Sequence, residues 1–423
     1  MNVTITPSGL IGRISAPSSK SFSHRMIIAA SLADGVSEVS AVNPSEDIDA
    51  TVDAMTALGA KIVNDGNVYT IKGIGIPSSS AKINCPAFIN CRESGSTLRF
   101  IIPVAAALGC DAEFSGSGKL PARPITPYKR ELSQKGVSFV HTDGVMPFTM
   151  SGKLCGGDFH IEGDVSSQFI TGLLFALPLC AEDSRIILTS KLESKPYADM
   201  TIAALKVFGV EVDESVSEEG FPVYNIKGNQ RYRAADCAVE GDYSQAAFYY
   251  VANALGSEIE IGNLNEASVQ GDRQICEILE KSGYGRVGCG EYEPFTVDVS
   301  DIPDLVPILT VFGCFTKDVS RIVNAKRLKI KESDRLKAIA DAINAIGGNV
   351  VYGDDFLEIH PVRSFTGGKI DGCNDHRIVM ASAVASTKAD GEITITDAQA
   401  VSKSYPDFWQ DFKKLGGKIS TDL

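Results

Sequence analysis

The feature that most constrains the fold of this chain is a repeat that occurs six times. In each copy an apolar, helix-like run ends at a glycine, and two short β-rich stretches separated by a turn follow it. The glycines recur about every seventy residues, a period too long for a common solenoid. Each suits the left-handed position that ends a helix. They are Gly59, Gly136, Gly209, Gly283, Gly347 and Gly416.

The stretches around these glycines complete the repeat. Two of the following hairpins have clear turn signals, at Asp65-Gly66 and near Gly353. A second apolar helix opens each copy after a polar loop, as in "SSKSFSHRMIIAA", "EGDVSSQFITGLLFAL" and "NDHRIVMASAVAS". Each copy is therefore predicted to be a β-α-β-α-β-β unit.

The two termini are expected to complete one unit together. The sixth copy ends after a single strand, "GKISTDL", whereas the N-terminus has spare strands in "NVTITP" and "GRISAP". We therefore predict an α/β protein of two similar domains with three units each. One domain takes residues 18–230, and the other takes residues 231–423 with the strands from 1–17. The two chain crossings, at Pro17 and near "GNQRYRAAD", would form a hinge.

Composition agrees with this plan and excludes several classes of protein. A chain of 423 residues with 44% hydrophobic and 22% charged residues is typical of a two-domain globular protein. No apolar run is long enough to cross a bilayer, and "MNVTITPSG" does not resemble a signal peptide. We expect a cytoplasmic protein without membrane contact. The net charge of −13 argues against a nucleic-acid partner.

Cysteine and histidine give no sign of a metal site. The ten cysteines are scattered singly without a C-x-x-C pattern, and the five histidines are never paired at i,i+4. We expect buried, reduced thiols and no bound metal.

The first repeat opening places cations where they should not favour a helix. In "APSSKSFSHRMIIAA", Ser18 or Ser19 can cap a helix whose apolar stripe contains Phe22, Met26, Ile27 and Ala30. Two cations occupy the first turns, at the positive end of the helix dipole. These residues, Lys20 and Arg25 with Ser21 between them, fit either a solvated basic surface or an anion site.

Other openings have the same ambiguity. "GDVSSQF" offers Ser166, Ser167 and Gln168, which can donate to phosphate oxygens or simply cap a helix. "SGSGKLPARP" holds Arg123 in a rigid loop, where it can aim a bidentate fork or lie on the surface. Gly95 in "RESGSTLRF" allows an anion to approach the backbone, and a tight loop needs glycine for the same reason.

The densest cluster of charges is "RLKIKESDRLKA", with Lys331, Glu332 and Arg335. An exposed helix start with ion pairs along the helix would also explain it. "NDHRIVMA" adds His376 and Arg377, "VSKSYPDFW" adds Lys403, and "DIPDLVP" adds Asp304, which a cap would explain equally well.

Considered together, the cations favour a substrate site. They lie at comparable places in the repeats and are divided between the two predicted domains. In an acidic protein this pattern indicates a cleft that closes on one or two polyanionic small molecules, with Glu332 and Asp304 as acid and base. The cations are Lys20, Arg25, Arg123, Lys331, Arg335, Arg377 and Lys403.

Six stretches in order along nearly the whole chain resemble the 5-enolpyruvylshikimate-3-phosphate (EPSP) synthase family of enolpyruvyl transferases. They are "PSSKSFSHR", "GDVSSQF", "SKPY", "IKESDRL", "NDHRIVMA" and "SKSYPDF". The resemblance implies the family's inside-out α/β barrel of two three-unit domains. It also implies transfer of the enolpyruvyl group of phosphoenolpyruvate to the 5-hydroxyl of 3-phosphoshikimate, through a tetrahedral intermediate. No cofactor and a monomer are implied too.

Residue roles follow from the same resemblance. Asp304 would be the base on the 5-hydroxyl and Glu332 the acid toward the methylene carbon, with Lys20 and Lys331 as further catalytic residues. The 3-phosphoshikimate site would comprise Lys20, Ser21, Arg25, Ser166, Ser167, Gln168, Ser194, Tyr197, Asp304 and Lys331. The phosphoenolpyruvate site would comprise Lys20, Gly95, Arg123, Gln168, Arg335, Arg377 and Lys403.

Some features separate this chain from relatives on the same scaffold. Glu93 and Arg327 stand where an Asn is common in another branch of the family, so neither is assigned to the site. The UDP-N-acetylglucosamine carboxyvinyltransferases have Lys-Asn in place of Lys20-Ser21 and usually a loop cysteine, which "SGSGKLPARP" lacks. A non-catalytic anion-binding protein on this scaffold remains the alternative from another class.

Overall fold

In the computed structural model the chain forms two compact units. The structure describes residues 1–75, 85–141, 146–285 and 291–422. One unit is Ser18–Glu240, and the other joins Met1–Pro17 to Gly241–Leu423. The second crossing falls later than residue 230, because the strand β14 (Cys237–Ala238) still pairs with β3 (Val36–Ser40) of the first unit.

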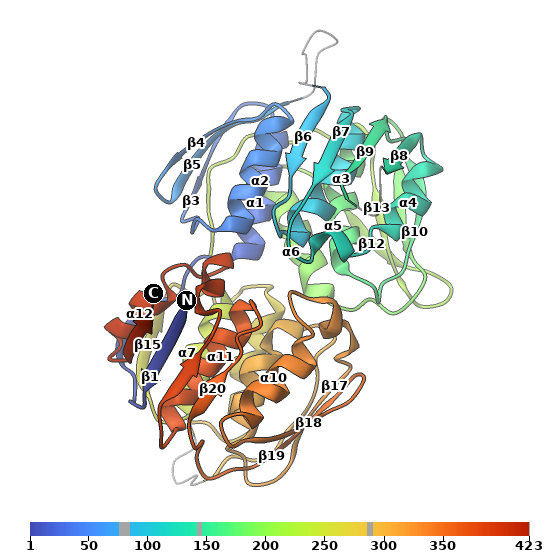
Figure 1. Cartoon of the computed structure of the whole chain (residues 1–423). Coiled ribbons are helices and arrows are strands. Elements are labelled where there is room, and N and C mark those ends of the chain that lie inside the picture. Colours follow the sequence, from blue (N-terminus) through green and yellow to red (C-terminus); the bar gives the residue numbers. More distant parts are fainter. Residues whose placement is uncertain (76–84, 142–145, 286–290, 423) are drawn as a thin grey trace. The chain divides into compact units, whose positions relative to one another are not determined.

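Three four-stranded sheets of one topology build the Ser18–Glu240 unit (Figure 1, blue to green). In each sheet the first two strands are parallel and the rest antiparallel. A helix connects the parallel pair in the second and third sheets, whereas in the first sheet the outer parallel strand comes from the end of the unit. The first sheet has the order β14-β3-β5-β4, with β5 at Val68–Lys72 and β4 at Lys61–Asp65. The second is β6 (Ala87–Asn90), β7 (Ala112–Ser115), β9 (Phe148–Gly152) and β8 (Val137–His141). The third is β10 (Gly157–Ile161), β11 (Ser184–Leu188), β13 (Pro222–Ile226) and β12 (Asp213–Val216).

In the other unit two four-stranded sheets repeat this topology, and one of them contains both terminal strands. β1 (Asn2–Thr6) lies antiparallel between β21 (Ile393–Ile395) and β22 (Lys418–Asp422), with β20 (Gly368–Ile370) at the edge. The predicted pairing of the termini is confirmed. A second sheet is β16 (Thr296–Asp298), β17 (Ser320–Val323), β19 (Leu357–His360) and β18 (Asn349–Tyr352). β2 (Ile11–Ser15) pairs in parallel with β15 (Glu258–Gly262). The hairpin predicted after Gly283 falls partly on 286–290, outside the described residues.

The helices that open the units form the two cores. In α1 every residue from Phe22 to Leu32 is buried, so this helix is covered all round and not only along the predicted apolar stripe. The corresponding helices are α1 (Lys20–Leu32), α3 (Gly95–Leu108) and α5 (Ser167–Ala176), and α7 (Tyr243–Ala254), α9 (Val306–Gly313) and α11 (His376–Ala385). The second helices bury one face and are α2 (Glu46–Ala57), α4 (Thr126–Ser133), α6 (Lys195–Val207), α8 (Gln274–Lys281), α10 (Arg335–Asn344) and α12 (Phe408–Lys414).

The repeat glycines have the backbone geometry that their place in the sequence predicts. All six have positive φ, from 76° at Gly209 to 114° at Gly59. A side chain is strained in this region, so glycine ends each helix without that cost. The helix-stop interpretation of the repeat is confirmed.

The sequence also led us to expect buried, reduced cysteines, no membrane-spanning segment and no bound metal. The nine cysteines in the described residues are free thiols. The expectation of burial is wrong for Cys85 and Cys155, which are exposed, and holds only in part for the half-buried Cys237, Cys276 and Cys373. None of the helices within the described ranges is long and apolar enough to cross a membrane. No group of three or more His, Cys, Asp or Glu side chains in the same part of the chain is arranged to hold a metal ion.

Candidate active site

The cation at the start of α1 is paired. Ser19 caps the helix by accepting from the Phe22 amide at 3.4 Å, and Lys20 is the first helical residue. Lys20 Nζ lies 2.8 Å from Oδ2 of Asp47, in the first turn of α2, and both side chains are about one-fifth exposed (19% and 18%). An anionic ligand at Lys20 therefore competes with a carboxylate already in place.

Arg25 is buried rather than part of a basic surface. It is 3% exposed, and its guanidinium donates to Thr201 Oγ1 at 2.9 Å, the Tyr197 carbonyl at 2.8 Å and the Ser21 carbonyl at 2.8 Å. Burial lowers its pKa to about 10, so the group remains cationic at neutral pH. Arg25 ties α1 to α6 and fixes the backbone around Ser21. The solvated-surface alternative is wrong for this residue.

Gly95, Arg123 and Gln168 meet at the starts of α3 and α5. A Cβ placed on Gly95 would lie 2.6 Å from Arg123 Nη1 and 3.6 Å from Gln168 Oε1. Gln168 Nε2 donates to Ser96 Oγ at 3.0 Å. The absence of a side chain at residue 95 thus lets a guanidinium and an amide lie against the beginning of a helix, where backbone amides favour an anion.

Arg99 orients this amide and was missed in the sequence. It is 6% exposed, and its Nη1 donates to Gln168 Oε1 at 2.6 Å. The bond fixes Gln168 with its oxygen toward Arg99 and its nitrogen toward Ser96. Within "RESGSTLRF" the apolar residues on either side of Arg99 gave no sign of a polar role.

The remaining predicted residues of this unit surround helix starts. Ser166 caps α5 by accepting from the Gln168 amide at 3.3 Å, so the capping interpretation holds for it. Ser194 precedes α6 with φ 61° and is 3% exposed. The ring centre of Tyr197 lies 5.9 Å from the Arg25 guanidinium carbon.

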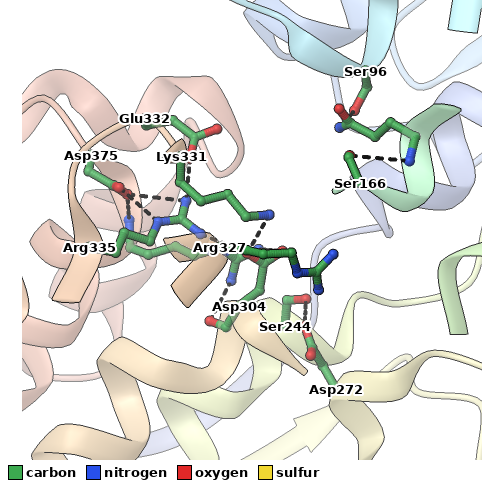
Figure 2. A network of polar contacts seen from close by, with 12 residues as sticks. Ser96, Ser166, Ser244, Asp272, Asp304, Arg327, Lys331, Glu332, Arg335 and Asp375 are labelled. Atoms are coloured by element: carbon green, nitrogen blue, oxygen red, sulfur yellow. Dashed lines mark hydrogen bonds and ion pairs between the residues drawn. The ribbon is translucent and has the colours of Figure 1, made fainter. Parts of the chain in front are cut away.

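In the other unit Arg335, the first residue of α10, joins three carboxylates (Figure 2). The side chain is 2% exposed, and it donates to Asp304 Oδ1 at 2.7 Å, Glu332 Oε2 at 2.6 Å and Asp375 Oδ2 at 2.8 Å. Burial acts to lower the pKa of this guanidinium, but the three carboxylates raise it above its ordinary value. The two residues predicted as base and acid are thus held by one cation.

Asp304 receives further cations on both of its carboxylate oxygens. It belongs to a short 3-10 helix, η4 (Pro303–Leu305), directly before α9. Arg377, near the start of α11, donates to its Oδ2 at 3.2 Å, and Lys331 Nζ lies 3.9 Å from its Oδ1. Asp304 is therefore anchored by these contacts and does not serve as a cap.

Lys331 and Glu332 precede the helix instead of starting it. Asp334 caps α10 by accepting from the Lys337 amide, and residues Lys326–Ile330 form a 3-10 helix, η5. The interpretation of this stretch as an exposed helix with i,i+4 pairs is wrong for Lys331. Burial lowers the pKa of Lys331 to about 8. The nearby cations Arg335 and Arg327 act in the same direction, whereas the Asp304 carboxylate opposes them.

Asp375 organises the helix start that carries Arg377. It is fully buried and caps α11 by accepting from the Arg377 amide at 3.0 Å, and it also accepts from Ser333 Oγ at 2.9 Å. Lys403, at the end of η7 (Ala398–Lys403), donates to the Asn374 carbonyl at 3.0 Å. The sequence signal for Asp375 was its place before an apolar helix, which indicates only a cap.

The residues left out of the predicted site have local partners. Arg327 Nη2 donates to the Ser300 carbonyl at 2.9 Å. The Glu93 carboxyl carbon lies 2.6 Å from a Cβ built on Gly118, so the two positions are in close contact.

Comparison with known proteins identifies close relatives. The family model described as EPSP synthase (3-phosphoshikimate 1-carboxyvinyltransferase) matches residues 5–412. The chain is 45% identical over 425 residues to the 3-phosphoshikimate 1-carboxyvinyltransferase of Clostridium kluyveri, covering 99% of this chain and 98% of that protein. It is 43% identical over 433 residues to the enzyme of the same name from Clostridium novyi, with the same coverage of 99% and 98%.

Solved structures share the fold. EPSP synthase from Acinetobacter baumannii matches with a TM-score of 0.82 at 23% identity, covering 99% of this chain and 100% of that one. The enolpyruvyl transferase NikO from Streptomyces tendae matches with a TM-score of 0.78 at 16% identity, covering 99% and 98%. The predicted enolpyruvyl transferase fold is confirmed.

Proposed function

Because this chain belongs to the EPSP synthase family, we propose a specific role in the family's reaction for each residue of the candidate active site. The enzyme transfers the enolpyruvyl group of phosphoenolpyruvate to 3-phosphoshikimate, a step of the shikimate pathway to the aromatic amino acids. The acceptor is the 5-hydroxyl and phosphate is released. The family establishes this reaction, and the contribution of each side chain is the proposal.

Most residues proposed to bind 3-phosphoshikimate lie at or near helix starts of the Ser18–Glu240 unit. Hydroxyls and an amide at a helix N-terminus are neutral donors to phosphate oxygens, and the helix dipole adds to their attraction. Arg25 supplies a fixed positive charge behind them, because burial and its hydrogen bonds hold it in one position. The proposed residues are Lys20, Ser21, Arg25, Ser166, Ser167, Gln168, Ser194 and Tyr197, with Asp304 and Lys331 from the other unit.

Phosphoenolpyruvate carries a phosphate and a carboxylate, and the proposed residues supply several cations. Gly95 leaves room beside the Arg123 guanidinium, and Gln168 is pre-oriented by Arg99. Guanidinium groups bind carboxylate and phosphate in a bidentate manner, which suits such a ligand. The proposed residues are Lys20, Gly95, Arg123 and Gln168, with Arg335, Arg377 and Lys403 from the other unit.

Asp304 and Glu332 are assigned the proton transfers. Asp304 removes the proton of the 5-hydroxyl while Glu332 donates a proton to the methylene carbon of phosphoenolpyruvate. The adjacent carbon gains cationic character, and the hydroxyl oxygen attacks it to give a tetrahedral intermediate. Loss of a methyl proton and departure of phosphate then restore the double bond. The observation that carries this assignment is that Arg335 holds both carboxylates, at 2.7 and 2.6 Å.

The test is release of phosphate from phosphoenolpyruvate with and without 3-phosphoshikimate. Release should depend on 3-phosphoshikimate and fall by about 100- to 10,000-fold in D304N and E332Q, as expected for loss of a general acid or base. D341N, which changes an exposed carboxylate on α10, is the control and should behave as wild type. Phosphate release that does not depend on 3-phosphoshikimate would refute the transferase activity. Unchanged rates in D304N and E332Q would refute the roles of Asp304 as base and Glu332 as acid.

Location and assembly follow the family expectation. We place the enzyme in the cytoplasm as a monomer, acting on its two small-molecule substrates. Sedimentation equilibrium with and without both substrates tests the assembly. A stable dimer would contradict it.

A further inference from the structure

A buried carboxyl beside the predicted base has no role in the proposed mechanism. Asp272 belongs to a 3-10 helix, η3 (Gly271–Arg273), and is 4% exposed. Its Oδ2 accepts the hydroxyl of Ser244, in the first turn of α7, and Figure 2 shows the pair beside Asp304. Its Oδ1 is buried without a hydrogen-bond partner among the described residues. A buried charge satisfied on only one oxygen is costly.

The charges that face Asp272 from the elements around it are mainly negative. Asp304 faces it from η4 and Asp242 from the cap of α7, and Arg377 of α11 is the cation that opposes them. The guanidinium of Arg377 already donates to the carboxylate of Asp304 at 3.2 Å and to its carbonyl at 3.3 Å. Arg377 is thus bonded to one carboxylate, that of Asp304, and lies within electrostatic range of a second, that of Asp272.

This environment favours the protonated acid. Burial first, then Asp304 and Asp242, raises the pKa of Asp272 to about 7, against the lowering effects of Arg377 and the Ser244 hydrogen bond. Both forms are therefore populated near neutral pH. The ionised form adds a further carboxylate around Arg377 and weakens its attraction for any other anion.

We propose that Asp272 is a positioning residue that works in its neutral form, in which it leaves Arg377 available to Asp304 and to an incoming phosphoenolpyruvate anion. When Asp272 ionises, it opposes binding of that anion. This rests on the proposed function, because it takes Arg377 as part of the phosphoenolpyruvate site. No covalent step is involved, and the proton exchanges with solvent.

The test compares D272N, which is neutral at every pH, with wild type between pH 6 and pH 8. The ratio of kcat/KM for phosphoenolpyruvate, variant to wild type, should be near one at pH 6 and rise about five- to tenfold by pH 8. A ratio that does not change with pH would overturn the proposal. So would a loss of more than about tenfold in D272N at pH 6, because the ionised form would then be the useful one. D341N should give a flat ratio.

S244A tests the proposal from the other side, because it removes the hydroxyl that donates a hydrogen bond to Asp272. The Ser244 hydroxyl stabilises the ionised carboxylate, so its removal should shift the pH-dependent fall in kcat/KM to higher pH. A purely structural role for Ser244 would lower activity equally at every pH. A shift to lower pH would contradict the proposal.

Two further measurements separate this proposal from the proposed function. The Kd of phosphoenolpyruvate can be measured by calorimetry across the same pH range, without turnover. The ratio of Kd, wild type to D272N, should rise with pH as the ratio of kcat/KM does. Between pH 5 and pH 7 Asp272 is protonated in the folded state and ionised in the unfolded state. The free energy of unfolding of wild type should therefore fall relative to that of D272N as pH rises from 5 to 7.5. Absence of 3-phosphoshikimate-dependent turnover in wild type would refute the function alone. A flat Kd ratio or a flat stability difference would refute the role of Asp272 alone.

Discussion

Arg335 donates from Nη1 to Oδ1 of Asp304 at 2.7 Å, and this bond joins the start of α10 to η4, directly before α9. The same guanidinium is engaged by Glu332 and Asp375. A substrate carboxylate that binds Arg335 must therefore displace a protein carboxylate or add to the cluster. Binding would then alter the surroundings of the proposed base and acid at the moment they are needed.

Removal of Arg335 should harm both stability and activity. R335A leaves three carboxylates facing one another, and breaking a buried ion pair from one side costs about 3–5 kcal/mol. The free energy of unfolding should drop by that amount and kcat/KM for phosphoenolpyruvate should fall steeply. Denaturant unfolding and steady-state kinetics measure the two effects. K337A, which breaks an exposed pair on the same helix, should cost no more than about 0.5 kcal/mol. Equal losses of unfolding free energy in R335A and K337A would show that the buried cluster around Arg335 contributes no more than an exposed ion pair.

A methyl group at residue 95 should weaken phosphoenolpyruvate binding selectively. In G95A the new Cβ would lie 2.6 Å from Arg123 Nη1, so the guanidinium must move. We expect KM for phosphoenolpyruvate to rise about tenfold, since one displaced charge-assisted contact is worth about 1.5–3 kcal/mol at most. KM for 3-phosphoshikimate should change less. G9A is the control, because a Cβ on Gly9 has no atom within 4 Å. A larger effect on 3-phosphoshikimate than on phosphoenolpyruvate would contradict the assignment.

Lys20 should matter to both substrates. K20A removes a cation proposed to contact each ligand, and it removes the ammonium that lies 2.8 Å from Asp47 Oδ2. We expect KM for both substrates to rise by about tenfold or more. The double variant K20A/D47N should be less impaired than K20A, because it also removes the negative charge that Lys20 faces. K61A, on the exposed strand β4, is the control. Normal binding of both substrates by K20A would exclude its assigned role.

Substrate binding should weaken at alkaline pH through Lys331. Burial lowers the pKa of Lys331 to about 8, and only the protonated form attracts an anion. The ammonium is lost as pH rises through this value, so KM for 3-phosphoshikimate should rise above pH 8. In K331R the side chain stays charged, and the ratio of wild-type to variant KM should rise with pH between 7 and 9. A ratio independent of pH would show that Lys331 does not titrate in this range.

Local sequence signals accounted for the repeat and the termini. A glycine in the left-handed region and a two-residue turn are determined by residues close in the chain, so the six helix ends and the hairpin at Asp65-Gly66 could be predicted. The helix beginning at Arg335 also had a local signal in its cap Asp334, which was overlooked among the surrounding charges. The family motifs identified the reaction, because they occur in order along nearly the whole chain and the family model matches residues 5–412.

The partners of the site residues were decided by the tertiary structure. Lys20 and Asp47 are 27 residues apart, and Asp272 and Ser244 are 28 apart, so no pattern within one helix relates them. Arg25 looked like a surface cation and is buried, because side chains of α3, α5 and α6 pack around it. The sequence by itself determined the units, the closure of the termini and the kind of chemistry. Only the packing of the units decided which charges are paired, because pairing and burial depend on distances that the order of residues does not specify.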